Sequence, residues 1–238
     1  MKKSLMILSL LFVFCLVLTG CGKKEDNKEN DNTKIQSGAW ETVMPTRKYE
    51  YGGKELEAFK SAQENYKDMV LEPIAFLGSQ VVSGTNYMFL AKGYTSGNEK
   101  NATYKIVIVY TDLQNNSSIT SVKDFDYSKY VSKAIDYKDE EIVGGWEVYS
   151  PSRPSELDNS DDHEVFTKAI EGFTGVYYAP SVVVAKQVVA GTNYAILCYG
   201  KTSTQTPKNY LFLLTIYKDL EGKVTLSSIA NIDLADLN

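Results

Sequence analysis

The chain has 238 residues, with 25 basic and 30 acidic side chains and a formal net charge of −5 at neutral pH. A mildly acidic chain without a basic cluster in its folded part is a poor nucleic-acid binder, so we expect no nucleic-acid partner. Its three cysteines and one histidine show no metal-ligand spacing, and we expect neither a metal nor a cofactor.

Residues 1–20 are typical of a secretion signal. Lys2 and Lys3 form a basic start, and Leu5 to Leu18 form an apolar run too short for a convincing membrane-spanning helix. The run closes with Leu18-Thr19-Gly20-Cys21, which resembles the lipobox of bacterial lipoproteins. That resemblance implies cleavage before Cys21 and acylation of this cysteine, which anchors the chain to the cell membrane or envelope, facing outward. A soluble secreted chain with an incidental Cys21 is the alternative.

Removal of the signal peptide changes the charge and the cysteine count. Loss of Lys2 and Lys3 leaves 23 basic residues against 30 acidic ones, a net charge of −7. Cys15 is lost and Cys21 is acylated, so Cys198 alone remains in the folded part and no intramolecular disulfide can form. Residues 21–36, the lipidated cysteine and a stretch of mixed charge, are expected to form a disordered tether.

A long internal repeat organises the rest of the chain. Gln80 to Tyr87 (Gln-Val-Val-Ser-Gly-Thr-Asn-Tyr) recurs almost unchanged as Gln187 to Tyr194, 107 residues later. A repeat of this length predicts a duplicated domain, because each copy is large enough for a core of its own. We therefore expect domains at residues 37–134 and 144–238, joined by a charged linker at residues 135–143.

Each repeat has a predicted helix that follows its leading glycine and precedes its strands. In the second repeat, Ser160 is a good N-cap before an acidic first turn, and Gly172 and Gly175 end the helix. Apolar residues then recur with helical spacing, as expected for one buried stripe. The predicted stripes are Leu56, Phe59, Ala62, Gln63 and Tyr66 in the first repeat, and Val165, Phe166, Ala169, Ile170 and Phe173 in the second.

Strands are predicted to follow each helix. In the second repeat they are residues 177–186, 192–199, 210–217 and 224–232, separated by a polar loop and a tight turn at residues 219–223. In the first repeat, Tyr104, Ile106, Ile108 and Tyr110 alternate with Lys105, Val107 and Val109, which suits a sheet with one face covered by the helix and the other partly wet. The prediction is an α+β fold, built twice, in which one helix packs on an antiparallel sheet of four to five strands.

This order of elements and the repeated octet together resemble the cystatin superfamily, and within it the disulfide-free stefins. The family signature is a leading glycine, a first hairpin of Gln-x-Val-x-Gly, and a second hairpin with an exposed apolar residue. It maps onto Gly38, Gln80, Val82, Gly84 and Leu113, and again onto Gly144 or Gly145, Gln187, Val189, Gly191 and Leu220. The resemblance implies two tandem cystatin-like domains in one monomeric chain.

The resemblance also implies a function, the reversible blocking of the active-site cleft of papain-like cysteine proteases. A rigid wedge needs a tight turn, which glycine permits, and a preorganised hairpin loses little entropy on docking. The expected contacts are the leading glycines Gly38, Gly144 and Gly145, the octet residues Gln80, Val81, Val82, Ser83, Gly84, Gln187, Val188, Val189, Ala190 and Gly191, and Leu113 and Leu220 on the second hairpins. The second repeat is expected to inhibit better, because it has two leading glycines and Ala190 in place of Ser83.

Several alternatives stay open at this stage. Trp40 and Trp146 could fill a protease pocket or fold back onto the domain. The chain could also be a non-inhibitory binding module for a peptide, a glycan or an envelope partner. A nucleophilic pair of Cys198 and His163 is disfavoured, because Cys198 falls on the inward phase of a strand and its counterpart is Ala91. We therefore do not expect an enzyme.

Overall fold

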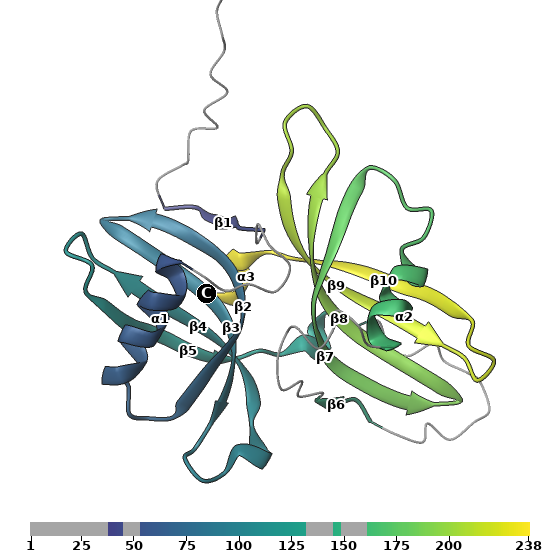
Figure 1. Cartoon of the computed structure of the whole chain (residues 1–238), viewed down its shortest axis with the longest axis horizontal. Helices are drawn as coiled ribbons and strands as arrows, with labels where there is room; N and C mark the ends of the chain where they lie inside the picture. The colour runs from purple at the N-terminus through teal and green to yellow at the C-terminus, as the bar shows by residue number, and fades with distance from the viewer. Residues whose placement is uncertain (1–37, 45–52, 132–144, 149–160) are drawn as a thin grey trace, which may run out of the picture. The chain divides into compact units, whose positions relative to one another are not determined.

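The structure is a computed structural model that describes residues 38–44, 53–131, 145–148 and 161–238 (Figure 1). We call residues 38–131 half one and residues 145–238 half two. The expected signal peptide, Cys21, the tether, the linker, Ser160 and Gly144 lie outside the described residues. Within the described ranges, no helix has the length and apolar character needed to cross a membrane.

Half one contains one five-stranded antiparallel sheet. Its strands are β1 (Trp40–Thr42), β2 (Val70–Val82), β3 (Gly84–Tyr94), β4 (Thr103–Thr111) and β5 (Ser117–Asp124), and they lie in this order across the sheet. The helix α1 (Lys54–Asn65) precedes β2. Two single-turn helices, η1 (Glu99–Asn101) and η2 (Tyr127–Lys129), lie in the connections.

Half two repeats this plan in a separate sheet. Its strands are β6 (Glu147–Val148), β7 (Val176–Val189), β8 (Gly191–Thr202), β9 (Asn209–Lys218) and β10 (Val224–Ile232), again with sequence neighbours paired antiparallel. The helix α2 (Asp161–Ala169) precedes β7, and the chain ends in the short helix α3 (Leu234–Leu237). The four strands predicted for the second repeat are present, and a two-residue strand precedes them.

The predicted fold class was wrong, because the protein is mainly β. Strands account for about half of the structure, whereas only two helices have seven or more residues. The strands are longer than the sequence indicated: β7 has 14 residues and extends into the octet as far as Val189, and β8 begins directly after Ala190. The two halves are therefore not domains of the α+β class, each built from a helix on a sheet.

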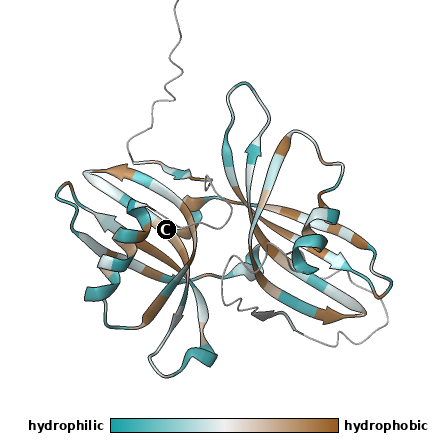
Figure 2. Cartoon of the chain, viewed as in Figure 1, coloured by the Kyte–Doolittle hydropathy of each residue, from teal (hydrophilic) through white to brown (hydrophobic). Residues whose placement is uncertain are grey.

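The arrangement of the core explains this correction. The largest buried cluster draws on both halves, with Leu77, Met88 and Leu90 from half one and Val184, Leu197 and Leu213 from half two among its members. Residues 35–238 accordingly form one compact unit. Each half adds a smaller core that includes its own helix. Figure 2 shows the apolar residues running along the strands.

The predicted helical stripes are only partly buried: Phe59, Ala62, Val165, Phe166 and Ala169 are buried, whereas Leu56, Gln63, Tyr66 and Ile170 are half-buried. Phe59 of α1 contacts the ring of Phe89 edge-on at 4.9 Å, and Phe166 of α2 is equally buried. Phe173, predicted on the second stripe, is 51% exposed. The reason is that α2 ends at Ala169 and the chain turns at Gly172, which has a φ of 82°.

The two tryptophans fold back onto the protein. Trp40 and Trp146 are both half-buried and pack against the cluster shared by the two halves. Trp40 lies opposite Gln80 in the pairing of β1 with β2. The pairing of β6 with β7 places Glu147 opposite Lys186, a register that carries Trp146 toward Gln187. The tryptophan beside each leading glycine is thus explained by packing.

Candidate functional site

The first octet forms the hairpin between β2 and β3. Val82 pairs with Gly84, which leaves Ser83 at the turn. Further from the turn, the side-chain amide of Asn86 donates a hydrogen bond of 2.7 Å to Oε1 of Gln80. The octet therefore contains its own cross-strand link between two side-chain amides.

The second octet forms the equivalent hairpin between β7 and β8. Val189 pairs with Gly191, with Ala190 at the turn. Nδ2 of Asn193 donates to Oε1 of Gln187 at 2.8 Å, and Gln187 is only 4% exposed. The position of Gln187 therefore does not support the predicted contact of this glutamine with a protease. The side chain of Gln187 accepts its hydrogen bond from Asn193 within the hairpin.

The octet glycines are also required by the fold. Gly84 and Gly191 have φ values of 125° and 121°, a region that favours glycine. A Cβ on Gly84 would lie 2.4 Å from the carbonyl oxygen of Thr111, and one on Gly191 would lie 2.3 Å from that of Lys218. Gly191 is buried and Gly84 is half-buried, so neither glycine is exposed as the predicted contact with a protease would require.

The carbonyl group at each turn is held by a tyrosine from the neighbouring strand. The hydroxyl of Tyr110 in β4 donates to the carbonyl oxygen of Ser83 at 2.5 Å. The hydroxyl of Tyr217 in β9 donates to the carbonyl oxygen of Ala190 in the same way. The first hairpin of each half is thus fixed against the strand that leads into the second hairpin.

In half one, the second hairpin is closed by an aspartate. Oδ1 of Asp112 accepts hydrogen bonds from the backbone N–H groups of Gln114 and Asn116, both at 2.8 Å. Asn115 has a φ of 66°, the left-handed conformation expected after a type I turn. Hydrogen bonds from Asn116 lower the pKa of Asp112, and the bond from the Asn116 side chain has the largest effect. Leu113 is left projecting at the tip, 78% exposed.

In half two, the second hairpin has the same construction. Oδ1 of Asp219 accepts from the backbone N–H groups of Glu221 at 3.0 Å and Lys223 at 2.8 Å. Gly222, with a φ of 85°, takes the left-handed position. Leu220 projects from this tip and is 84% exposed. The two second hairpins therefore present the same apolar residue on the same scaffold.

Exposed apolar side chains gather on these hairpins. Among the described residues, seven large apolar side chains are exposed, and five of them are octet or second-hairpin residues. These five are Val81, Val82, Leu113, Val188 and Leu220. The other two, Phe173 and Tyr177, lie near the start of β7. We refer to the paired hairpins of each half, residues 80–86 with 111–117 and residues 187–193 with 218–224, as the apolar tips.

Two of the leading glycines, Gly38 and Gly145, lie within the described residues, and both are exposed with open space around the Cβ position. The N–H of Gly38 donates to the carbonyl oxygen of Val81 at 2.9 Å, and Nε2 of Gln80 donates to the carbonyl oxygen of Gly38 at 2.5 Å. Gly38 therefore lies beside the first hairpin of half one.

The residues with chemical reactivity do not form a site. Cys198 is completely buried in the smaller core of half two, and this burial raises the pKa of its thiol. His163 lies in the first turn of α2 and does not belong to that core. Over the described part of the chain, no three His, Cys, Asp or Glu side chains are grouped to hold a metal ion.

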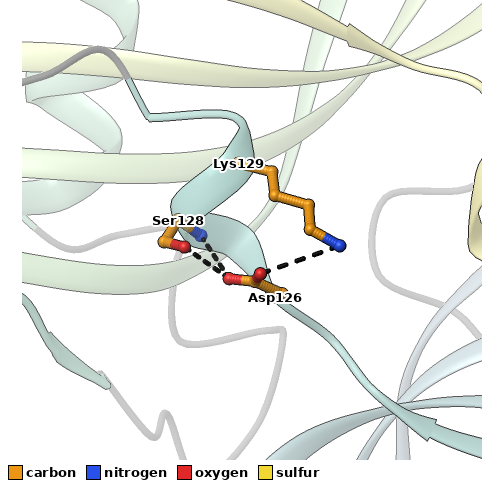
Figure 3. A network of polar contacts seen from close by, with 3 residues as sticks. All are labelled: Asp126, Ser128 and Lys129. Atoms are coloured by element: carbon orange, nitrogen blue, oxygen red, sulfur yellow. Dashed lines mark hydrogen bonds and ion pairs between the residues drawn. The ribbon is translucent and has the colours of Figure 1, made fainter.

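One compact polar cluster proves to be a helix cap. Figure 3 shows Oδ1 of Asp126 accepting from the backbone N–H and the hydroxyl of Ser128, at 3.2 and 2.5 Å. Nζ of Lys129 lies 3.7 Å from the other carboxylate oxygen. The hydrogen bond from Ser128 is the main reason why the pKa of Asp126 is lowered. The cluster stabilises the start of η2 and lies outside the apolar tips.

Sequence reasoning missed several residues that build the tips. The tyrosine at the turn carbonyl, the asparagine paired with the octet glutamine and the aspartate of the second hairpin all recur at the repeat spacing of 107 residues. That recurrence was the available signal, but their hydrogen-bond partners depend on strand pairing.

Searches of known protein families and of curated proteins found no match to this sequence.

Proposed function

We propose that the protein is a reversible inhibitor of papain-like cysteine proteases, and that its apolar tips enter the active-site cleft of the protease. The observation that carries the proposal is the exposure of apolar side chains on the tips. Leu113 and Leu220 are 78% and 84% exposed on hairpins that are otherwise well hydrogen-bonded. Clustered exposed apolar groups on a soluble protein mark a binding surface.

The tips are organised before any partner binds. In each first hairpin, a tyrosine hydroxyl (Tyr110 or Tyr217) donates a hydrogen bond to the carbonyl oxygen at the turn. In each second hairpin, an aspartate (Asp112 or Asp219) accepts hydrogen bonds from backbone N–H groups of the turn. A preorganised surface loses little conformational entropy on binding, so a small apolar contact area can give useful affinity. The proposed mechanism is occlusion alone, with Val81, Val82 and Leu113, or Val188 and Leu220, against the walls of the cleft.

The class of partner that we propose rests on the repeated octet. Its Gln-Val-Val-x-Gly sequence resembles the inhibitory hairpin of the cystatins, which occlude papain-like proteases. The buried thiol of Cys198 takes no part, and no bond forms or breaks in the proposed complex. We further propose that acylated Cys21 holds the inhibitor on the outer face of the cell envelope, where extracellular proteases would meet it.

A second candidate function is a non-inhibitory binding module for a peptide, a glycan or an envelope partner. The observation that favours it is the structural role of the octet. The glutamine binds the asparagine, and the glycine avoids a clash with the neighbouring strand. Folding therefore accounts for the two octet residues that had suggested inhibition. The exposed valines and leucines remain unexplained by folding, and they decide our preference for inhibition.

The test is an inhibition titration with the soluble chain that starts at Gly22. We expect reversible inhibition of papain and related enzymes, with the inhibitor recovered uncleaved. The whole chain should be used, because the two halves share their largest core. Absence of inhibition across several papain-like enzymes would contradict the proposal and favour the binding module.

Paired substitutions locate the contact surface. Val81→Asp with Leu113→Asp alters the tip of half one, and Val188→Asp with Leu220→Asp alters that of half two. Because these side chains are exposed, each pair should leave the melting temperature nearly unchanged. We expect each pair to weaken its own site at least about a hundredfold, as loss of central apolar contacts does at protein interfaces.

A matched control separates contact from general surface change. Phe173→Asp with Tyr177→Asp alters two apolar side chains that are 51% and 58% exposed but lie outside the apolar tips. Inhibition should be the same as that of the unaltered chain. If this control lost inhibition as strongly as the tip variants, the tips would not be the binding surface.

A further inference from the structure

An ion pair lies at the base of the octet in half two. Lys186 directly precedes the octet, and its Nζ lies 2.9 and 2.8 Å from the two carboxylate oxygens of Asp162. Asp162 is only 7% exposed, although it belongs to the first turn of α2. The same Nζ lies 5.2 Å from the ring centroid of Tyr194, the last octet residue, within range of a cation–π interaction. Helix, strand and octet therefore meet at one charged group.

Half one does not contain this connection. The residues equivalent to Asp162 and Lys186 are Glu55 and Ser79, and a serine cannot form the ion pair. The helix of half one is instead tied to its sheet through Gln63. Oε1 of Gln63 accepts from the backbone N–H of Leu71 at 3.1 Å, at the start of β2 and far along the strand from the octet. In half one the helix therefore bonds to the start of the following strand, whereas in half two it bonds near the end of that strand.

The ion pair lies where the edge strand of half two meets the strand that carries the second octet. Within the described residues, β6 pairs with β7 at Ala185 and Lys186. Lys186 is therefore held from one side by the pairing with β6 and from α2 by Asp162.

We propose that Asp162 and Lys186 are positioning residues for the apolar tip of half two, which makes the orientation of that tip depend on α2. The inference rests on the proposed function. A charge pair that is largely removed from water is costly to break on one side only, because the remaining charge stays poorly solvated. The pair therefore restrains the end of β7, and through it the hairpin that follows.

Amide hydrogen exchange tests the restraint without any protease. Asp162→Asn keeps the shape of the side chain and removes its charge. We expect the amides of Val188 to Thr192 to exchange roughly tenfold faster, in line with loss of a partly buried ion pair. The amides of Val81 to Thr85 serve as an internal reference and should not change. Asp162→Glu, which restores the charge, should return exchange toward that of the original chain.

The same helix supplies a matched control. Glu164 and Lys168 form an exposed ion pair of 2.7 Å, with side chains 65% and 52% exposed. Glu164→Gln should leave exchange in the octet unchanged. Equal acceleration by Glu164→Gln and Asp162→Asn would overturn the inference, because the effect would then belong to the helix as a whole. Unchanged exchange in Asp162→Asn would also overturn it.

Inhibition measurements connect the restraint to function. In a chain whose first tip is disabled by Val81→Asp and Leu113→Asp, Asp162→Asn should weaken inhibition about tenfold. Unchanged inhibition would overturn the positioning role. If the disabled chain and the original chain both fail to inhibit, the proposed function fails, while the exchange experiment still decides whether the ion pair restrains the hairpin.

Discussion

The hydroxyl of Tyr199 donates a hydrogen bond of 2.7 Å to the carbonyl oxygen of Phe76 in the other half. Phe76 lies where the pairing of β2 with β3 shifts register, at a β-bulge. The equivalent residue in half two, Val183, lies at an equivalent shift in β7, and its carbonyl oxygen accepts from the hydroxyl of Tyr104 at 3.3 Å. A bulge disrupts the local ladder, and here each bulge meets a tyrosine of the opposite half.

This relationship predicts that the halves stabilise each other. Tyr199→Phe removes a buried hydroxyl and leaves the carbonyl oxygen of Phe76 without this hydrogen-bond donor. The substitution should lower the free energy of unfolding by about 1–2 kcal/mol. Chemical denaturation of the whole chain should show one transition, because the largest core is shared. Tyr177→Phe, at a 58% exposed tyrosine, is the control and should be nearly neutral. Two separate transitions, with only one shifted by Tyr199→Phe, would contradict the shared core.

The octet glycine is predicted to be essential for folding. Gly191→Ala places a Cβ close to the carbonyl oxygen of Lys218 in a strained backbone conformation, and should destabilise the chain by at least about 2 kcal/mol. Gly145→Ala meets open space and should change the melting temperature little. A stable Gly191→Ala variant would show that the hairpin can shift without cost. This result also means that octet glycine variants are poor probes of inhibition.

The second hairpin of half one should loosen in acid. The pKa of Asp112 lies below its ordinary value of 3.8, mainly because of hydrogen bonds from Asn116. The carboxylate therefore contributes stability above the ordinary pKa, and this contribution is lost as the pH falls through the lowered value. The amide resonances of Gln114 and Asn116 should titrate together below about pH 4, the ordinary range for aspartate. Asp112→Asn should abolish this titration, and a midpoint above 3.8 would contradict the assignment.

The thiol of Cys198 should be unreactive in the folded protein. It is completely buried, and burial raises its pKa, so thiolate is scarce and inaccessible. In the soluble chain from Gly22, this is the only cysteine. A thiol-specific reagent should label it at the rate of unfolding, and immediately in denaturant. Rapid labelling under native conditions would show that the core of half two opens locally.

The local elements were largely accessible from the sequence. The strand predicted at residues 224–232 is β10, and that predicted at 210–217 lies within β9 (Asn209–Lys218). The helical stripe correctly marked Phe59 and Phe166 as buried. These features are encoded by residue periodicity and turn chemistry within short segments, which a single sequence displays directly.

The sequence by itself determined the duplication, the hairpins of each repeat and the apolar residues at their tips. Tertiary structure decided that Gln187 binds Asn193 instead of facing a partner, that Gly191 is buried, and that both halves contribute to one core. These outcomes depend on strand register and on contacts between residues about a hundred positions apart. A pattern of residue types along the chain specifies which side chains must be buried, but the partner of each buried group is fixed only when the sheets pair and pack.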